Sequence, residues 1–219
     1  AKSDPKRVVF AEADHLDVLK AAQIVHDEGI GFPILLGNRE IILELKQEID
    51  FTAEVPIIDP KLPKQKKKRH EYAQKFWEVR QRKGTKLLDA QKLMRERNYY
   101  AAMMVNEGDA DGLITGYSRN YAAVVKPMLE LIGMTKGVSR VAASNLMLTK
   151  RGPMFLADTT INLNPTAKQL AKICQLTASL VKMFGMKPNI ALLSFSNFGA
   201  SSSESSKKIK LAVDHIHKY

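Results

Sequence analysis

The chain has 219 residues, 45% hydrophobic and 26% charged, which is the composition of an ordinary globular protein with a buried core. Its formal charge of +11 favours anionic partners. No run of 18 apolar residues is present and no apolar stretch follows the basic first residues, so we expect neither a membrane partner nor a signal peptide. The single cysteine excludes an internal disulfide and predicts a reducing compartment, most simply a cytoplasm.

Short apolar runs alternate with longer amphipathic stretches in the first half of the chain. RVVFAEA at residues 7–13, PILLG at 33–37 and VPII at 55–58 predict three strands. Asp14 and Asn38 stand where the helices after the first two strands should begin, and we expect both to cap them. The alternation predicts a three-layer α/β/α fold with a mainly parallel sheet.

A basic stretch, KLPKQKKKR at residues 61–69, carries much of the excess positive charge. We interpret it as a solvated surface loop broken by prolines. Nucleic acid and a polyanionic cofactor are the alternatives. Modules that bind nucleic acid usually interleave aromatic residues or glycines with their basic residues, and this stretch does not, so nucleic acid is an unfavoured partner.

The rest of the chain predicts a second subdomain after the first sheet. Helices are expected at 70–83, 85–107 and 120–132, with the strand GLITG at 112–116 between the last two. Further on we expect a hairpin from 140–148 and 153–158, a helix at 165–184 capped by Asn164, a buried strand NIALLSF at 189–195 and a last helix at 204–217. We therefore predict two subdomains, residues 1–136 and 137–219.

Polar residues follow the predicted strand at 112–116, at the edge where parallel sheets bind ligands. Ser118 and Arg119 precede a helix that carries Lys126, and free amides at a helix start together with cations suit a phosphate or a carboxylate. The alternative is a plain strand–helix turn capped by Asn120.

A second candidate loop follows the predicted strand at 189–195. Its hydroxyls and amides are expected to surround an anion, and the candidate ligands are Ser194, Ser196, Asn197, Gly199 and Ser201. The alternative is a solvated serine-rich linker.

Arg80, in WEVRQRKG at residues 77–84, stands near the end of a helix, where cations are ordinary partners of the helix dipole. The five histidines are scattered, so no metal site is expected. Asp109 and Asp111 are interpreted as a polar turn, and Cys174 as a buried residue of the helix at 165–184.

Several stretches, taken in order, resemble the phosphate acetyl/butyryltransferase family. They are VVFAEAD at 8–14 with Ala21 and Ala22, PILLG at 33–37, EVRQRKG at 78–84, AAMMVNEGDADGLITG at 101–116, FLAD at 155–158, NPTA at 164–167 and ALLSFSNFG at 191–199. The stretch at 144–167 and LLSFSNFG are more similar to one branch, the C-terminal domain of multidomain NADP-dependent malic enzymes.

The resemblance implies a regulatory and oligomerisation domain that binds acetyl-CoA or another acyl-CoA. NADP and a divalent metal, Mg or Mn, would then be held by the malic enzyme domains that precede it in the parent chain, and this fragment would carry no cofactor. The family implies a phosphate-binding role for Arg80, while Lys126 stands where true acetyltransferases have arginine. Lysine keeps the charge and loses the bidentate fork.

The family's catalytic Ser-Arg pair belongs to a C-terminal segment that is missing here. We therefore expect no catalytic residue in this fragment, a first subdomain that is incomplete, and a chain cut from a longer one. The alternative is a truncated phosphate acetyl- or butyryltransferase that moves an acyl group between acyl phosphate and CoA.

Overall fold

The computed structural model describes residues 2–134, 138–196 and 200–217. The chain separates into two compact units, Ala1–Gly133 and Met134–Tyr219. The division falls between Gly133 and Met134, whereas the sequence predicts a boundary between residues 136 and 137.

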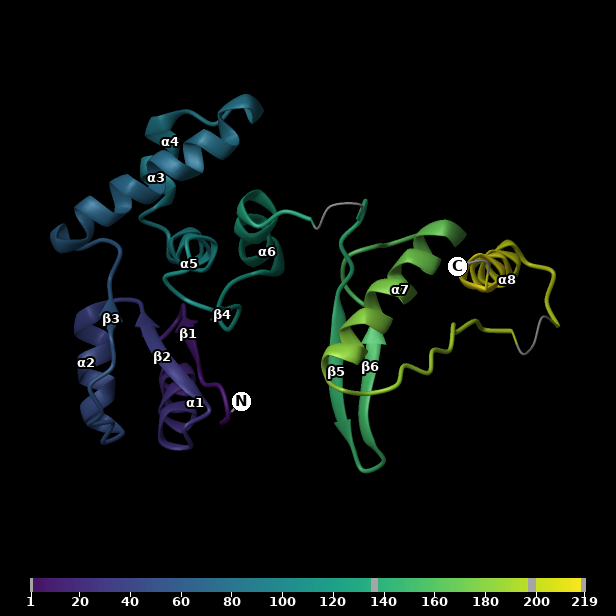
Figure 1. The fold of residues 1–219 in the computed structure, drawn as a ribbon, viewed down its shortest axis with the longest axis horizontal. Coiled ribbons are helices and arrows are strands. Elements are labelled where there is room, and N and C mark those ends of the chain that lie inside the picture. Colours follow the sequence, from purple (N-terminus) through teal and green to yellow (C-terminus); the bar gives the residue numbers. More distant parts are fainter. Residues whose placement is uncertain (1, 135–137, 197–199, 218–219) are drawn as a thin grey trace. The chain divides into compact units, whose positions relative to one another are not determined.

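Unit 1 is built on a four-stranded sheet with the order β3-β2-β1-β4 (Figure 1). Its strands are β1 (Lys6–Phe10), β2 (Gly31–Leu36), β3 (Ile57–Ile58) and β4 (Gly112–Ile114), and every neighbouring pair is parallel. The prediction of a parallel sheet in the first half is confirmed. Because the strands run the same way, their carboxyl ends meet at one edge.

The first helical layer consists of α1 (Leu16–Asp27) and α2 (Arg39–Glu48). Alternate strand residues face it, among them Phe10 and Leu35, and they pack against Leu19 and Ile42 in one buried cluster. Asn38 caps α2 as predicted, accepting hydrogen bonds from the amides of the first helical turn.

The second helical layer contains α3 (Lys66–Arg80), α4 (Leu87–Leu93), α5 (Arg97–Asn106) and α6 (Tyr121–Leu131). Val9 and Ile34, one step along the strands, face this side and join a larger buried cluster that includes Phe76 and Tyr100. The sheet thus lies between two helical layers, which confirms the three-layer α/β/α class (Figure 1).

Three local predictions for unit 1 are wrong. Asp14 does not cap α1, which begins after His15 without a side-chain cap, because the Asp14 carboxylate accepts hydrogen bonds from Arg97. The basic stretch at 61–69 is not a loop throughout: it forms a 3-10 turn, Pro63–Gln65, and then the start of α3. The helix expected at 85–107 is two helices, because the chain turns at residues 94–96.

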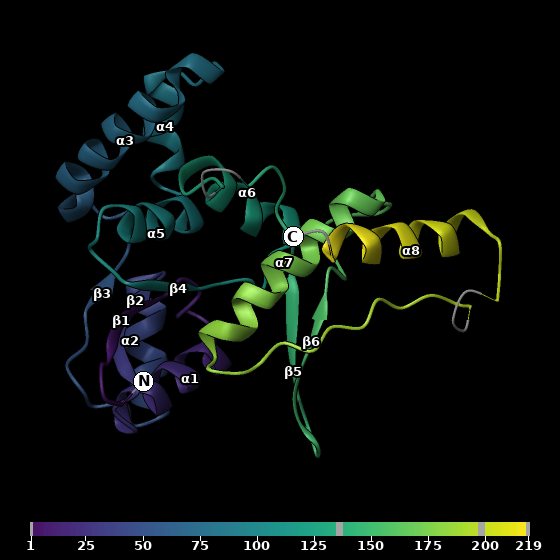
Figure 2. The ribbon, with the colours of Figure 1, turned by 45° about the vertical axis from the view of Figure 1, so that its right-hand side comes forward.

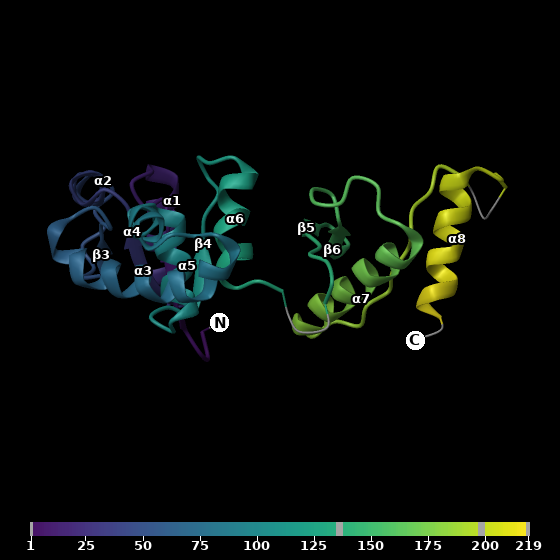
Figure 3. The same cartoon turned by 90° about the horizontal axis from the view of Figure 1, so that it is seen from above.

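Unit 2 contains the predicted hairpin, β5 (Ser144–Thr149) paired antiparallel with β6 (Gly152–Ala157). The helix α7 (Ala167–Met183) packs on the hairpin, which Figure 3 shows end-on, and α8 (Glu204–Ile216) packs on α7 (Figure 2). Asn164 is not the cap of α7. Thr166 takes that role, in a reciprocal pair of hydrogen bonds with Gln169.

The buried strand predicted at 189–195 does not form in the described part of unit 2. These residues pair with no strand, and the side chain of Leu193 is 83% exposed. A strand is stable only when a neighbour satisfies its backbone groups and its apolar side chains find a core. The apolar run is present, but a neighbouring strand is missing from the described part.

Candidate functional site

The turn after β4 forms a concave group of backbone amides at the carboxyl edge of the unit 1 sheet. The amides of Gly116, Tyr117 and Ser118 lie 2.7, 2.9 and 2.8 Å from the carboxylate oxygens of Glu12, which follows β1. Gly116 has a φ of 103°, a conformation that glycine adopts without strain. The protein's own carboxylate therefore occupies an anion-binding turn.

Glu12 is only 1% exposed. Burial raises the pKa of its carboxyl, but hydrogen bonds from the Ser118 hydroxyl and from the three amides outweigh burial and bring the pKa down to about 2. Ser118, predicted from the sequence as a ligand of phosphate, thus directs its amide and its hydroxyl at Glu12.

A bidentate ion pair ties α5 to the same edge. Arg97 Nη1 and Nη2 lie 2.6 and 2.9 Å from the two carboxylate oxygens of Asp14, and the Asn38 amide also donates to Asp14. Gly37 makes room for this carboxylate, since a Cβ on it would lie 3.0 Å from Asp14 Cγ. The pair fixes the N-terminus of α5 beside the ends of β1 and β2.

A hollow of about 210 Å³ opens at the N-terminus of α5. The first intrahelical bond of α5 runs from the Tyr100 amide to the Glu96 carbonyl, so the amides of residues 97–99 precede the hydrogen-bonded turns. Glu96 provides no side-chain cap. Amides at a helix start and the positive end of the helix dipole favour an anion.

Arg119 and Lys126 line this hollow from the turn after β4 and from α6. Both side chains are exposed, and neither forms an ion pair with an acidic residue in the ranges that the structure describes. Arg119 also lines a smaller adjoining hollow of about 70 Å³, together with Lys61, Arg95 and Arg97. Two of the predicted site residues therefore meet at a depression whose walls carry more basic than acidic side chains, the acidic ones being Glu96 and Asp59.

Arg80 lies outside both hollows. It ends α3, where its Nη2 is 3.4 Å from Glu130 of α6, and the other oxygen of Glu130 accepts a hydrogen bond from the Tyr99 hydroxyl at 2.7 Å. The Arg80 side chain is 17% exposed, and its Nε has no partner in the described structure. Its charge is balanced by Glu130 at the contact of α3 with α6.

The serine-rich candidate belongs to unit 2. Ser194 and Ser196 accept hydrogen bonds from loop amides, and the Ser201 amide donates to Ser196 at 3.0 Å. Ser203 caps α8. Asn197 and Gly199 lie outside the described residues. The described hydroxyls of this loop thus bind its own backbone, and their predicted role toward a ligand stays a prediction.

Sequence reasoning missed Glu12, Arg97 and Asn98. Asn98 is 7% exposed, lines the larger hollow and accepts a hydrogen bond from the Thr115 hydroxyl at 2.8 Å. Arg97 and Asn98 lie at the start of a helix because the chain turns at 94–96, and no glycine or proline there marks the turn. The weak signal was the cluster of arginines in RERN at 95–98.

In the described ranges, no group of three or more His, Cys, Asp or Glu residues is placed to hold a metal ion. The described helices include none that is long and apolar enough to cross a membrane.

Unit 1 is thus an α/β unit with a parallel sheet and a candidate anion site at the carboxyl edge of that sheet. The Phosphate acetyl/butaryl transferase family model matches residues 1–218, so the chain belongs to that family. A solved phosphotransacetylase from Streptococcus pyogenes superposes with a TM-score of 0.85 at 34% identity, covering 98% of this chain and 65% of its own.

Curated relatives fall into two groups. The NADP-dependent malic enzyme of Salmonella typhimurium is 33% identical over 99% of this chain, which spans 29% of that enzyme. The phosphate acetyltransferase of Thermoanaerobacterium thermosaccharolyticum is 34% identical over 98% of this chain, which spans 66% of that protein. The chain therefore corresponds to part of each relative, and the family domain is common to both groups.

Proposed function

We propose that the hollow at the N-terminus of α5 binds the phosphate groups of an acyl-CoA. The observation that carries the proposal is the meeting of Arg119 and Lys126, both without an acidic partner in the described ranges, at the unbonded amides of residues 97–99. Phosphate oxygens accept hydrogen bonds from such amides and gain from the positive helix end. Asn98 also lines the hollow, with its Oδ1 bonded to the Thr115 hydroxyl.

In this proposal the chain serves as a regulatory and oligomerisation domain of an NADP-dependent malic enzyme, with acetyl-CoA as the effector. Support comes from the malic enzyme relatives, of which the chain spans less than a third. NADP and a divalent metal would then be bound by the other domains of the parent protein. Regulation requires two assembly states with different affinity for acetyl-CoA.

Titration of the chain with acetyl-CoA, followed by calorimetry, tests the site. Lys126→Ala and Arg119→Ala are each expected to weaken binding about tenfold or more, since a charge-assisted hydrogen bond contributes about 1.5–3 kcal/mol. Lys20→Ala is the matched control, because it removes one exposed positive charge from α1, in the opposite helical layer. Affinities of all variants equal to that of Lys20→Ala would refute the site.

Arg80→Ala separates the hollow from the role that the family resemblance gives to Arg80. Because Arg80 is paired with Glu130, we expect the variant to unfold more easily and to bind acetyl-CoA as the wild type does. A loss of affinity as large as that of Lys126→Ala, at unchanged stability, would place Arg80 in the ligand site.

Phosphate acyl transfer is the second candidate function, favoured by the phosphate acetyltransferase relatives. The CoA thiolate would attack the carbonyl carbon of acetyl phosphate, so that the C–S bond forms and the C–O bond to phosphate breaks, releasing inorganic phosphate. The cations of the hollow would stabilise the charge that develops on the phosphate oxygens. Equal release of phosphate and formation of thioester, abolished in Lys126→Ala, would establish transfer instead of regulation.

A further inference from the structure

One buried carboxylate contacts the structures that form the hollow at α5. Glu12 is 1% exposed and does not itself line the hollow. Its two oxygens accept hydrogen bonds from the three amides of residues 116–118, at 2.7 to 2.9 Å, and from the Ser118 hydroxyl. The hydroxyl of Thr115, the preceding residue, lies 3.4 Å from Glu12 Oε1. Glu12 thus holds the turn after β4 without lining the space in which a ligand would lie.

The cationic wall of the hollow depends on this turn. Arg119 follows the last of the three bonded amides directly in the chain. Asn120 comes next and caps α6, accepting a hydrogen bond from the Ala123 amide at 2.9 Å, and α6 carries Lys126. A change in the course of the turn would therefore move both of the cations, Arg119 and Lys126, that line the hollow.

The second wall, the start of α5, is joined to the same turn through Thr115. The Thr115 hydroxyl donates to Asn98 Oδ1 at 2.8 Å, and Asn98 lies in the first turn of α5. A hydroxyl has a single hydrogen, so this bond is its main one. The Gly116 amide, bonded to Glu12 at 2.7 Å, keeps the neighbouring Thr115 beside α5. Both walls of the hollow are therefore connected to Glu12.

Coulomb's law alone disfavours a carboxylate at this place. A negative charge near an anion site repels the anion and lowers its affinity. Glu12 nevertheless holds the turn that leads directly into Arg119. Because its charge is matched by three amides and a hydroxyl, its main effect on the hollow is on geometry.

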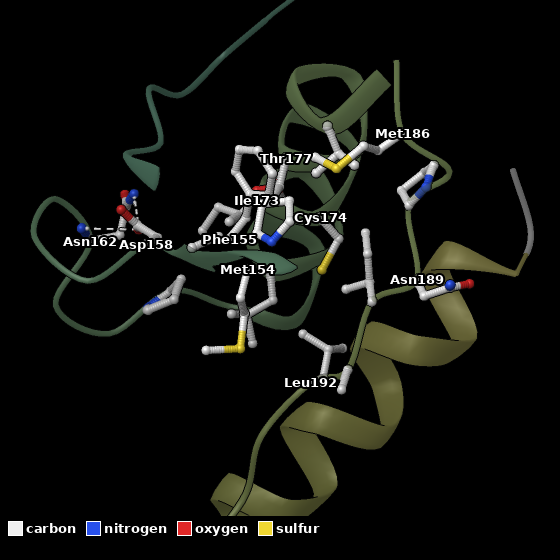
Figure 4. Close-up of a pocket in the computed structure, with 18 of the residues that line it drawn as sticks. Met154, Phe155, Asp158, Asn162, Ile173, Cys174, Thr177, Met186, Asn189 and Leu192 are labelled. Carbon is white, nitrogen blue, oxygen red and sulfur yellow. Dashed lines mark hydrogen bonds between the residues drawn. The ribbon is translucent and has the colours of Figure 1, made fainter. Parts of the chain in front are cut away.

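A carboxylate also holds a loop in unit 2, but that loop carries no cation. Asp158 accepts hydrogen bonds from the Asn162 amide at 3.2 Å and from the Asn162 side chain at 2.5 Å (Figure 4). The loop reads DTTIN, and the hollow beside it, of about 580 Å³, is lined mainly by apolar side chains such as Met154 and Phe155. The turn held by Glu12 differs because a cation follows it directly.

We propose that Glu12 is a positioning residue for the anion hollow. It holds Arg119, Lys126 and the start of α5 in the arrangement that receives phosphate groups. The inference rests on the proposed function, because it concerns the same hollow. Glu12 makes no contact with the ligand and acts through the turn after β4 and, by way of Thr115, through Asn98. Removal of the carboxylate should therefore weaken anion binding, although it also removes a negative charge.

Two substitutions that each remove one negative charge beside the same turn test this opposition. Glu12→Gln removes the buried carboxylate, and Asp17→Asn removes an exposed one, which accepts a hydrogen bond from the Tyr117 hydroxyl at 2.5 Å. Acetyl-CoA is titrated into the full 219-residue chain and its variants. Glu12→Gln should weaken binding about tenfold or more, whereas Asp17→Asn should leave the affinity unchanged or slightly higher. Equal affinities of the two variants, or tighter binding by Glu12→Gln, would overturn the proposal.

Two further variants separate positioning from a general loss of stability. Ile42→Ala removes a buried side chain from the opposite helical layer, so it should destabilise the chain and still bind acetyl-CoA as the wild type does. Thr115→Val keeps the shape of the side chain and removes the bond to Asn98, and should weaken binding about fivefold even if Glu12→Gln does not fold. Binding weakened as much in Ile42→Ala as in Glu12→Gln, or unchanged in Thr115→Val, would contradict the proposal.

Hydrogen exchange without ligand tests Glu12 independently of the proposed function. The amides of residues 116–118 report on the turn, and those of residues 100–102 report on the first hydrogen-bonded turn of α5. Glu12→Gln should speed exchange at both places at least tenfold relative to Ile42→Ala. If the wild type does not bind acetyl-CoA, the proposed function fails and this measurement still decides on Glu12. Equal rates at residues 100–102 in the two variants would show that Glu12 does not hold the start of α5.

Discussion

The two units contain similar apolar runs, but they differ in how far those runs are paired and buried. In unit 1 the run PILLG becomes β2, which pairs on both sides and buries Leu35 and Leu36 completely. In unit 2 the run NIALLSF stays extended, unpaired among the described residues and largely exposed. An apolar run therefore indicates that a segment can form a strand. Whether the strand forms depends on neighbouring strands with which it can pair.

The two units also differ in the pairing of polar groups and in the exposure of apolar side chains. At the carboxyl edge of unit 1, Glu12 and Asp14 are buried or nearly so, and each is matched by several donors. Such satisfied networks hold one arrangement of the chain. The hairpin of unit 2 instead exposes apolar side chains such as Leu148, which is 86% exposed. The polar groups at this edge of unit 1 are buried and paired, whereas unit 2 leaves large apolar side chains of its hairpin exposed.

The largest expected effect tests that contrast with the same substitution in both units. Phe76→Ala removes a side chain that is 1% exposed in the core of unit 1 and should lower the free energy of unfolding by about 3–5 kcal/mol. Phe155→Ala removes a half-buried ring that contacts Phe184, and should cost only about 1–2 kcal/mol.

Each unit carries its own reporter for this measurement. Trp77, the one tryptophan, packs against the unit 1 core, and Cys174 lies buried in unit 2. Urea titrations followed by Trp77 fluorescence and by pulsed alkylation of Cys174 give the two unfolding curves. Equal losses for the two variants would contradict the contrast.

Glu12→Gln should have the next largest effect, about 2 kcal/mol at neutral pH, because an amide cannot accept from all the donors that surround the carboxylate. The pKa of Glu12 is lowered to about 2 from 4.5, so its contribution to stability is complete above 4.5 and is lost as the pH falls from 4.5 toward 2. The wild type should therefore lose stability across that window.

The variant should lack the part of this pH dependence that belongs to Glu12. The measurement is the urea midpoint of Trp77 fluorescence at several pH values between 6 and about 2.5. Glu44→Gln, an exposed glutamate on α2, is the control and should follow the wild type. If Glu12→Gln and wild type show parallel pH profiles, the carboxylate is not what holds the turn after β4.

The sequence predicted the sheet of unit 1 and the hairpin of unit 2 because their signals are local. Apolar runs, turn residues and the cap at Asn38 each act within a few residues. The candidate site was predicted only in part. Arg119 and Lys126 do meet at a hollow, but its third component, the start of α5, depends on a helix break at 94–96 and on the Arg97–Asp14 pair, which joins residues 83 positions apart. Pairings of that range leave no periodic trace in one sequence.

The smallest expected effects come from the two helix caps. They test whether a cap contributes the same free energy of unfolding in both units. Asn38→Ala in α2 and Thr166→Ala in α7 each remove a side-chain acceptor from the first turn, at a cost of about 1 kcal/mol. Because a cap acts on its own helix, the two losses should agree although the two cores differ. Trp77 fluorescence measures the first and Cys174 alkylation the second. A much larger loss for Thr166→Ala would mean that α7 depends on its cap because the hairpin packs against it too weakly. The two units would then also differ in the stability of their individual helices.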